Sequence, residues 1–157
     1  MSQKNKKKEP GFKFIKTSGG IEEYHLESNN LRILTLEDHS APVATFMVTY
    51  HVGSRNEAIG YTGATHLLEH LMFKGSKKFN KEKNTAIWSE LQNIGAQINA
   101  TTWNDRTNYF EVVPSEHLER AIAIEADRMR HAFLKDEDRQ PEMTVVRNEF
   151  ERGENSP

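Results

Sequence analysis

Two histidines and one glutamate lie within five consecutive residues, in the segment His66-Leu67-Leu68-Glu69-His70. On an α-helix, the side chains of His66, Glu69 and His70 project from nearly the same face. The two imidazoles of such a helix can bind one metal ion while the carboxylate stands beside it. The segment therefore predicts the metal site of a zinc hydrolase.

An alternative for this segment is an amphipathic helix whose histidines and glutamate simply face water. The neighbouring residues argue against it, because they make most of the helix circumference apolar. These apolar residues are Leu67, Leu68, Leu71, Met72 and Phe73. Burying two imidazoles and a carboxylate costs free energy unless each group has a partner. A bound metal ion would supply that partner.

A zinc site needs a third protein ligand, and the end of the chain offers two carboxylates for it. Glu142 and Glu149 belong to an expected helix, where they share one stripe with Val145 and Val146. Glu151 points away from that stripe and is a weaker candidate. The alternative is that both glutamates only flank an apolar helix face. The spacing leaves both glutamates as candidate ligands.

The expected chemistry follows from the charges of these groups. His66 and His70 would bind zinc as neutral imidazoles, one carboxylate would complete the protein ligands, and water would take the fourth position. Glu69 would not bind the metal. It would act as the general base on the zinc-bound water and pass the proton to a leaving amine.

The pattern of apolar residues and turn signals predicts the elements that must position these side chains. Strands are expected at residues 22–28, 31–36, 43–52, 96–102 and 107–113, and helices at 64–73, 81–93, 115–130 and after Pro141. Polar turns at Asn29-Asn30 and Asn104-Asp105 join neighbouring strands as hairpins. This order predicts an α+β fold, an antiparallel sheet with helices packed on it.

The composition fits one domain with a sizeable core. The chain has 157 residues and a net charge of −2, which does not favour a nucleic-acid partner. It has no cysteine, so His, Asp or Glu must hold any metal. We expect residues 1–20, which begin with the basic run of Lys4, Lys6, Lys7 and Lys8, to form a basic flexible tail and residues 21–157 to form the domain.

The sequence says little about the location of the protein. No apolar run reaches the length of a membrane span, and no signal peptide is visible. We therefore expect no membrane span, and the location stays open between the cytoplasm and, after processing, the periplasm.

Five segments carry a resemblance to a known family and occur in the order that the family shows. They are residues 53–57 (GSRNE), 63–75 (GATHLLEHLMFKG), 95–101 (GAQINAT), 105–109 (DRTNY) and 145–149 (VVRNE). Together they resemble the M16 peptidases, the inverted zinc proteases that include pitrilysin, insulin-degrading enzyme and the mitochondrial processing peptidases. The resemblance covers about residues 22–157 and implies an M16 peptidase-like (LuxS/MPP-like) α+β domain.

The resemblance implies roles for individual residues. Glu149 would be the third zinc ligand, and Glu142 would orient a ligating group from outside the ligand set. Asn99 and Ala100 would lie on an edge strand, beside which a substrate adds as a further β-strand. The alternative for these two residues is an ordinary hairpin strand in which Asn99 acts as a cap.

The resemblance also implies an activity. The chain would be the N-terminal domain of a zinc metalloendopeptidase that cleaves extended peptides or unfolded proteins. A second M16 half-domain, on the same chain or on a partner subunit, completes such enzymes. We therefore expect a domain truncated at its C-terminal end, weakly active or inactive alone. The alternative is a non-catalytic M16-like subunit or interaction module, and the retained His66, Glu69, His70 and Glu149 favour the peptidase.

Overall fold

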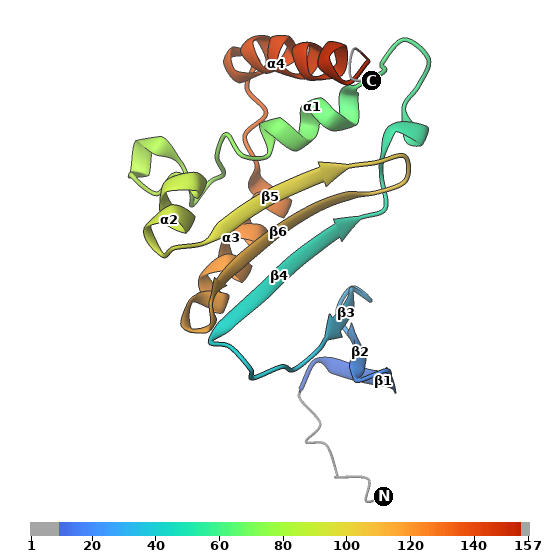
Figure 1. Ribbon diagram of the computed structural model, residues 1–157, viewed down its shortest axis with the longest axis vertical. Coiled ribbons are helices and arrows are strands. Elements are labelled where there is room, and N and C mark those ends of the chain that lie inside the picture. Colours follow the sequence, from blue (N-terminus) through green and yellow to red (C-terminus); the bar gives the residue numbers. More distant parts are fainter. Residues whose placement is uncertain (1–9, 155–157) are drawn as a thin grey trace, which may run out of the picture. The chain divides into compact units, whose positions relative to one another are not determined.

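The structure, a computed structural model, describes residues 10–154 of the chain, with side chains for residues 10–152. The chain forms two compact units, Met1–Ala41 and Pro42–Pro157. Each unit contains its own antiparallel sheet of three strands, and Figure 1 shows the elements of both. The candidate ligands all lie in the second unit.

The first unit is a small sheet with the strand order β1-β2-β3. Its strands are β1 (Phe12–Ser18), β2 (Ile21–Leu26) and β3 (Arg32–Thr35). β2 and β3 pair antiparallel, which confirms the hairpin expected around Asn29-Asn30. Asn30 adopts the left-handed backbone that such a turn requires, with φ of 59°.

β1 lies within residues 1–20, for which the sequence predicted a tail without a strand. The strand forms because Gly19-Gly20 makes a tight turn that folds it onto β2. Both glycines have positive φ, 57° and 84°, a conformation that glycine adopts without steric cost. Lys4, Lys6, Lys7 and Lys8 lie outside the described residues, whereas Lys13 and Lys16 belong to β1.

The second unit is built on a sheet with the strand order β4-β6-β5. Its strands are β4 (Val43–Tyr50), β5 (Gln97–Thr102) and β6 (Thr107–Pro114). Among the described residues, β5 therefore lies at an edge of this sheet (Figure 1). Every second residue of β6 from Thr107 to Val113 is buried, so one face of the sheet is covered.

Helices cover that face. The described part of this unit has α1 (Ala64–Leu71), α2 (Ile87–Asn93), α3 (Leu118–His131) and α4 (Asp136–Glu154), with 3₁₀ turns η1 (Ser54–Asn56), η2 (Lys81–Lys83) and η3 (Ser115–His117). α1 packs against both α4 and β5 (Figure 1). This arrangement confirms the α+β fold expected from the sequence. No helix in the described part of the chain combines the length and the apolar character needed to cross a bilayer.

The apolar core of this unit consists of Phe79, Ile87, Leu91 and Ile124, with Phe73, Ile94, Ala96 and Ile98 packed around them. Leu91 and Ile124 are fully buried. Full burial of each such side chain contributes about 1.5–3 kcal/mol of stability. Because Phe73 lies two residues after the last residue of α1, this core anchors the end of the helix that carries the two histidines.

A buried ionic cluster lies between α3 and the sheet. The guanidinium of Arg128 binds Glu125 and lies 3.6 Å from Glu111 of β6. It also stacks on the rings of Tyr109, at 4.2 Å, and Phe73, at 4.8 Å. Burial, together with the hydrogen bond and charge of Glu125, raises the pKa of Glu111 to about 9. Arg128 thus connects α3, the sheet and the end of α1.

Two helices begin at positions that differ from the sequence prediction. The helix expected over residues 81–93 is a 3₁₀ turn followed by α2, which begins only at Ile87. Asn84 separates the two with a φ of 56°, which interrupts a right-handed helix. α4 begins at Asp136 instead of after Pro141, because its acidic first turn favours a helix N-terminus there. Pro141 lies inside α4, where it removes one helix hydrogen bond.

Candidate metal centre

The start of α1 is held by a carboxylate from the preceding loop. Glu57 accepts hydrogen bonds from the backbone N–H groups of Gly63 and Thr65, both at 2.9 Å, and from the Thr65 hydroxyl at 2.6 Å. Burial raises the pKa of Glu57, but these hydrogen bonds outweigh burial and hold the pKa below its usual value. A carboxylate stabilises a helix N-terminus, so Glu57 fixes where α1 begins and where His66 lies.

Three expected ligands meet between α1 and α4. Ligand atoms of His66, His70 and Glu149 lie within 4.8 Å of one another. Oε2 of Glu149 is 3.3 Å from Nε2 of His66 and 3.6 Å from Nε2 of His70. The two imidazole rings stand edge to face, with 4.9 Å between their centroids. The packing of α4 on α1 therefore brings a carboxylate to the histidine pair.

This donor set fits a zinc ion. Two imidazole nitrogens and one carboxylate oxygen are the protein ligands of many catalytic zinc sites. With metal–ligand distances of about 2.1 Å, the ligand atoms of a tetrahedral site lie about 3.4 Å apart. The distances of 3.3 and 3.6 Å between Glu149 and the imidazoles match that spacing. The His66 side chain is 35% exposed and that of Glu149 is 47% exposed, so an ion can reach them.

Glu142 lies behind His70, outside the ligand group. Its Oε2 is 2.9 Å from Nδ1 of His70, and the ammonium of Lys74 binds its other oxygen. Burial raises the pKa of Glu142, but hydrogen bonds from Lys74 and His70 prevail and hold the pKa below its usual value. The ionised Glu142 accepts the proton on Nδ1, which leaves the lone pair of Nε2 on the side of Glu149.

Glu69 lies close to the ligand group but has a different partner. It is 9% exposed, and its Oε2 accepts a hydrogen bond from the hydroxyl of Thr102 at 2.5 Å. Thr102 is the last residue of β5 and lies on the same strand face as Ala100. Thr102 was not among the residues predicted from the sequence. The alternation of β5 indicates the face that Thr102 occupies, but the contact with α1 depends on tertiary packing.

A cavity of 590 Å³ opens at these residues. It is lined by the ligand group, by Glu69 and by the end of β5, including Asn99 and Ala100. The structure therefore brings the expected substrate-binding residues to the same cavity as the expected ligands. Oδ1 of Asn99 accepts a hydrogen bond from the N–H of Ala100 at 2.8 Å. The side chain of Asn99 thus accepts a hydrogen bond from a backbone N–H of the edge strand β5.

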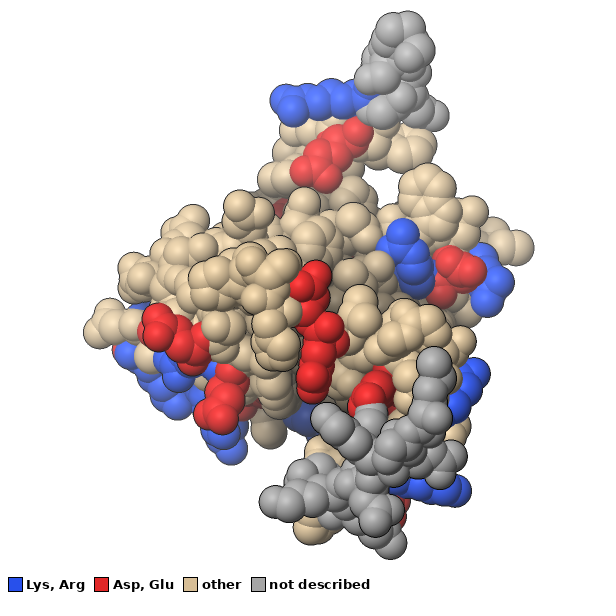
Figure 2. Space-filling model, turned by 60° about the horizontal axis from the view of Figure 1, so that its bottom comes forward, with Lys and Arg blue, Asp and Glu red and all other residues tan. Residues whose placement is uncertain are grey.

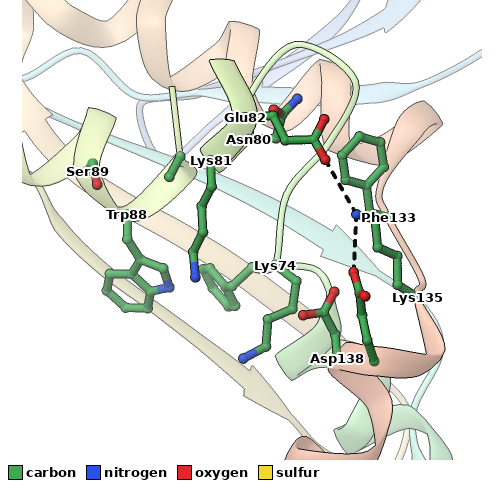
Figure 3. A pocket seen from close by; sticks show the side chains of 12 residues that line it. Lys74, Asn80, Lys81, Glu82, Trp88, Ser89, Phe133, Lys135 and Asp138 are labelled. Carbon is green, nitrogen blue, oxygen red and sulfur yellow. Dashed lines mark ion pairs between the residues drawn. The ribbon is translucent and has the colours of Figure 1, made fainter. Parts of the chain in front are cut away.

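A second cavity, of 480 Å³, lies where the end of α1, α2 and the start of α4 meet (Figure 3). Three lysines and three acidic residues line it, so their charges balance. Lys135 forms ion pairs with Glu82, at 3.8 Å, and Glu137, at 3.4 Å, which Figure 3 marks with dashed lines. Its described lining has no histidine, so the imidazole chemistry belongs to the first cavity.

The surface shown in Figure 2 carries acidic and basic side chains interspersed among uncharged ones. The net charge of the whole chain is only −2.

Residues 32–157 match the family described as Insulinase (Peptidase family M16), and this range includes every residue of the candidate metal centre. The chain belongs to the M16 peptidase family. The resemblance found in the sequence is thereby confirmed.

The relatives of the chain include one that is named as a protease and one that is named as a subunit of a mitochondrial complex. It is 35% identical over 127 residues to an uncharacterized zinc protease of Streptomyces coelicolor, covering 81% of this chain and 27% of that protein. It is 32% identical over 131 residues to subunit 1 of the mitochondrial cytochrome b-c1 complex of Homo sapiens, covering 83% of this chain and 26% of that protein.

A solved structure shares the fold. The crystal structure of a protease from Helicobacter pylori superposes with a TM-score of 0.77 at 33% sequence identity, covering 87% of this chain and 32% of that chain. The chain therefore spans between 26% and 32% of the length of these three relatives.

Proposed function

We propose that this chain provides the zinc-binding part of an M16-type metalloendopeptidase that hydrolyses peptide bonds of extended peptides or unfolded proteins. The proposal rests on the convergence of two histidines and one carboxylate, with a second carboxylate, Glu69, close by but bound to another partner. The similarity to a protein named as a zinc protease supports both the reaction and the ion.

Each residue of the centre would have a separate role. His66, His70 and Glu149 would hold zinc, and Glu142 would orient His70 through Nδ1. When bound, the ion would supply a Lewis acid that polarises the peptide carbonyl and makes a water more acidic. Glu69 would accept the proton of the attacking water and deliver it to the amine nitrogen as the C–N bond breaks.

The edge strand supports a substrate in extended form. Asn99 and Ala100 of β5 border the cavity that also contains the ligand group. A peptide that pairs with β5 would present its backbone carbonyls along the cavity, and main-chain hydrogen bonds would bind it with little regard to sequence. The side chain of Asn99 would have to release the N–H of Ala100 for a substrate carbonyl to take it.

Further parts would complete the enzyme. The chain spans 27% of the length of the zinc protease from Streptomyces coelicolor. We propose that a second M16 half, on the same chain or on a partner subunit, closes the substrate site. The isolated chain would then bind zinc but cleave peptides weakly or not at all.

A non-catalytic M16 subunit is the second candidate. The similarity to a subunit of the cytochrome b-c1 complex favours it, because that relative is named for its place in an assembly. The four residues His66, Glu69, His70 and Glu149 and their geometry favour the peptidase. If the chain binds zinc but shows no peptidase activity even when a second M16 half is present, the non-catalytic subunit is preferred.

The zinc content of purified variants tests the proposed ligands. The native chain should carry about one zinc ion per molecule, and His70→Ala should lose it because two ligands hold the ion poorly. His39→Ala is the matched control, since the His39 side chain is 91% exposed, and it should keep the ion. Equal zinc in the native chain and in His70→Ala would contradict the assignment.

Glu69→Gln tests the base separately from the ligands. In a complete enzyme, the amide should leave zinc binding intact and lower peptide hydrolysis by about 10²–10⁴-fold, since it cannot accept the proton. Glu116→Gln changes a glutamate whose side chain is 80% exposed and should leave hydrolysis unchanged. A Glu69→Gln enzyme with native activity would rule out this residue as the base.

A further inference from the structure

We infer that Thr102 is a positioning residue for Glu69, holding the carboxylate of the general base through its hydroxyl. The inference rests on the proposed function, in which Glu69 receives a proton. Oγ1 of Thr102 lies 2.5 Å from Oε2 of Glu69, and it joins the end of β5 to the middle of α1. Hydrogen bonds to a charged acceptor are short and about twice as strong as neutral ones.

The direction of this hydrogen bond follows from counting hydroxyl protons. Oγ1 of Thr107 lies 3.0 Å from the carbonyl oxygen of Val52, which can only accept, so the single Thr107 proton goes there. Oγ1 of Thr102 lies 3.5 Å from Oγ1 of Thr107, whose proton is already in use. Thr102 has one hydroxyl proton and two acceptors in reach, and it donates to Oε2 of Glu69 because that oxygen, at 2.5 Å, is much closer than Oγ1 of Thr107.

The hydroxyl that holds Glu69 is itself held by the sheet. Thr102 and Thr107 are directly paired in the register of β5 and β6, and Thr107 is 7% exposed. A β-branched threonine also has few side-chain rotamers, so its hydroxyl stays where the strand places it. The rigid strand thus limits the rotation of the Glu69 carboxylate.

The contact leaves the second oxygen of Glu69 for chemistry. Oε2 accepts from Thr102, whereas Oε1 takes part in no hydrogen bond within the described residues. Because Glu69 lines the same cavity as His66, His70 and Glu149, one fixed oxygen sets where the other can meet a water. Misplacement of a reacting group by about 1 Å costs about 10²-fold in rate, which is the scale of effect that positioning controls.

A double-mutant cycle on the zinc-free chain tests the contact without relying on activity. The variants are Thr102→Val, Glu69→Met and their combination, each removing one side of the hydrogen bond with little change in shape. We expect the double variant to lower the urea midpoint by clearly less than the sum of the two single variants. Additive shifts would overturn the inference.

Thr101 provides the control pair for this cycle. It is exposed on the other face of β5, and its hydroxyl accepts a hydrogen bond from Arg106. Thr101→Val and Glu69→Met should therefore shift the urea midpoint additively. Equal non-additivity in the two cycles would show a general strand effect and would also overturn the inference.

Kinetics separate positioning from a purely structural role. Wherever hydrolysis is measurable, Thr102→Val should lower kcat about 10–100-fold at unchanged KM and zinc content, and Thr102→Ser should restore it. A serine variant as slow as the valine variant would contradict the role of the hydroxyl. If the proposed function fails, the native chain lacks zinc or hydrolysis, and the double-mutant cycle still decides whether Thr102 holds Glu69.

Discussion

The two clusters of ionisable side chains in the second unit balance their charges in opposite ways. The cluster between α3 and the sheet is closed, because Arg128 supplies the cation for Glu125, the raised pKa keeps Glu111 protonated near neutral pH, and all three are at most 1% exposed. The cluster between α1 and α4 is open. Its two imidazoles and the carboxylate of Glu149 are partly exposed and direct their acceptor atoms at one another.

This difference separates a structural cluster from a binding one. A buried ion pair that contains its own counter-charge is weak evidence for function, since a ligand would have nothing left to neutralise. Acceptors that converge in a partly exposed group suit a cation as their ligand, in keeping with the proposed zinc site. The two clusters are also connected, because Arg128 stacks on Phe73, which lies two residues after the end of α1.

The largest expected effect comes from opening the closed cluster. Arg128→Leu should lower the free energy of unfolding by about 3–5 kcal/mol, because it leaves the carboxylate of Glu125 buried without a cation. Urea unfolding followed by circular dichroism measures the loss. Arg130→Leu, at an exposed position of the same helix, should change stability by less than about 0.5 kcal/mol. Similar losses in both variants would show that the cluster does not depend on its counter-charge.

A smaller effect is expected at the support of the open cluster. Glu142→Gln replaces the charged acceptor of the His70 Nδ1 proton by a neutral amide, so zinc affinity should fall about 10–100-fold. Competition with a chelating dye measures this affinity. Glu137→Gln, also in α4 but paired with Lys135, should bind zinc as the native chain does. Unchanged affinity in Glu142→Gln would mean that Glu142 does not act through His70.

The closed cluster should also give the protein a pH dependence of stability. The pKa of Glu111 rises from 4.5 to about 9 on folding, so the folded state binds its proton more tightly. The contribution of Glu111 to the free energy of unfolding is fully present below pH 4.5, the unfolded pKa. It is lost as the pH rises from there to about 9, the folded pKa. Glu111→Gln mimics the protonated form, so its urea midpoint should fall less over this window. Parallel curves for the two proteins would contradict the raised pKa.

The open cluster is largely visible in the sequence because its geometry is local. The period of one helix places His66, Glu69 and His70 on a common face, and no tertiary contact is needed to see it. The helix stripe made both Glu142 and Glu149 candidate ligands, and only the family resemblance selected Glu149 as the third ligand. The structure brings Glu149 to the histidines through the packing of α4 on α1.

The closed cluster and Thr102 could not be predicted in the same way. Glu125 and Arg128 lie three residues apart, a spacing that is ordinary on an exposed helix face. Their burial depends on how α3 meets the sheet, which no local pattern encodes. The contact between Thr102 and Glu69 likewise joins a strand to a helix. Helix starts at Ile87 and Asp136 were misjudged because a left-handed Asn and a tolerated proline are weak local signals.

The smallest expected effect concerns the edge strand beside the open cluster. The backbone N–H of Ala100 donates a hydrogen bond to Oδ1 of Asn99 at 2.8 Å. This side chain shields the N–H from solvent on an edge strand. Asn99→Ala should therefore speed hydrogen exchange of this amide about threefold to tenfold, the range that corresponds to one exposed hydrogen bond of about 0.5–1.5 kcal/mol. Exchange followed by NMR measures it.

Exchange of the Ala100 amide also tests whether Asn99 blocks the pairing of a peptide with β5. Thr101→Ala, which removes the next side chain on that face of β5, should leave the exchange of the Ala100 amide unchanged and serves as the control. A peptide that pairs with β5 should slow this exchange more in Asn99→Ala than in the native chain, because no side chain has to leave first. If the Ala100 amide of the native chain exchanges as fast as in Asn99→Ala, the Asn99 side chain does not protect it. A peptide could then pair with β5 without a movement of Asn99.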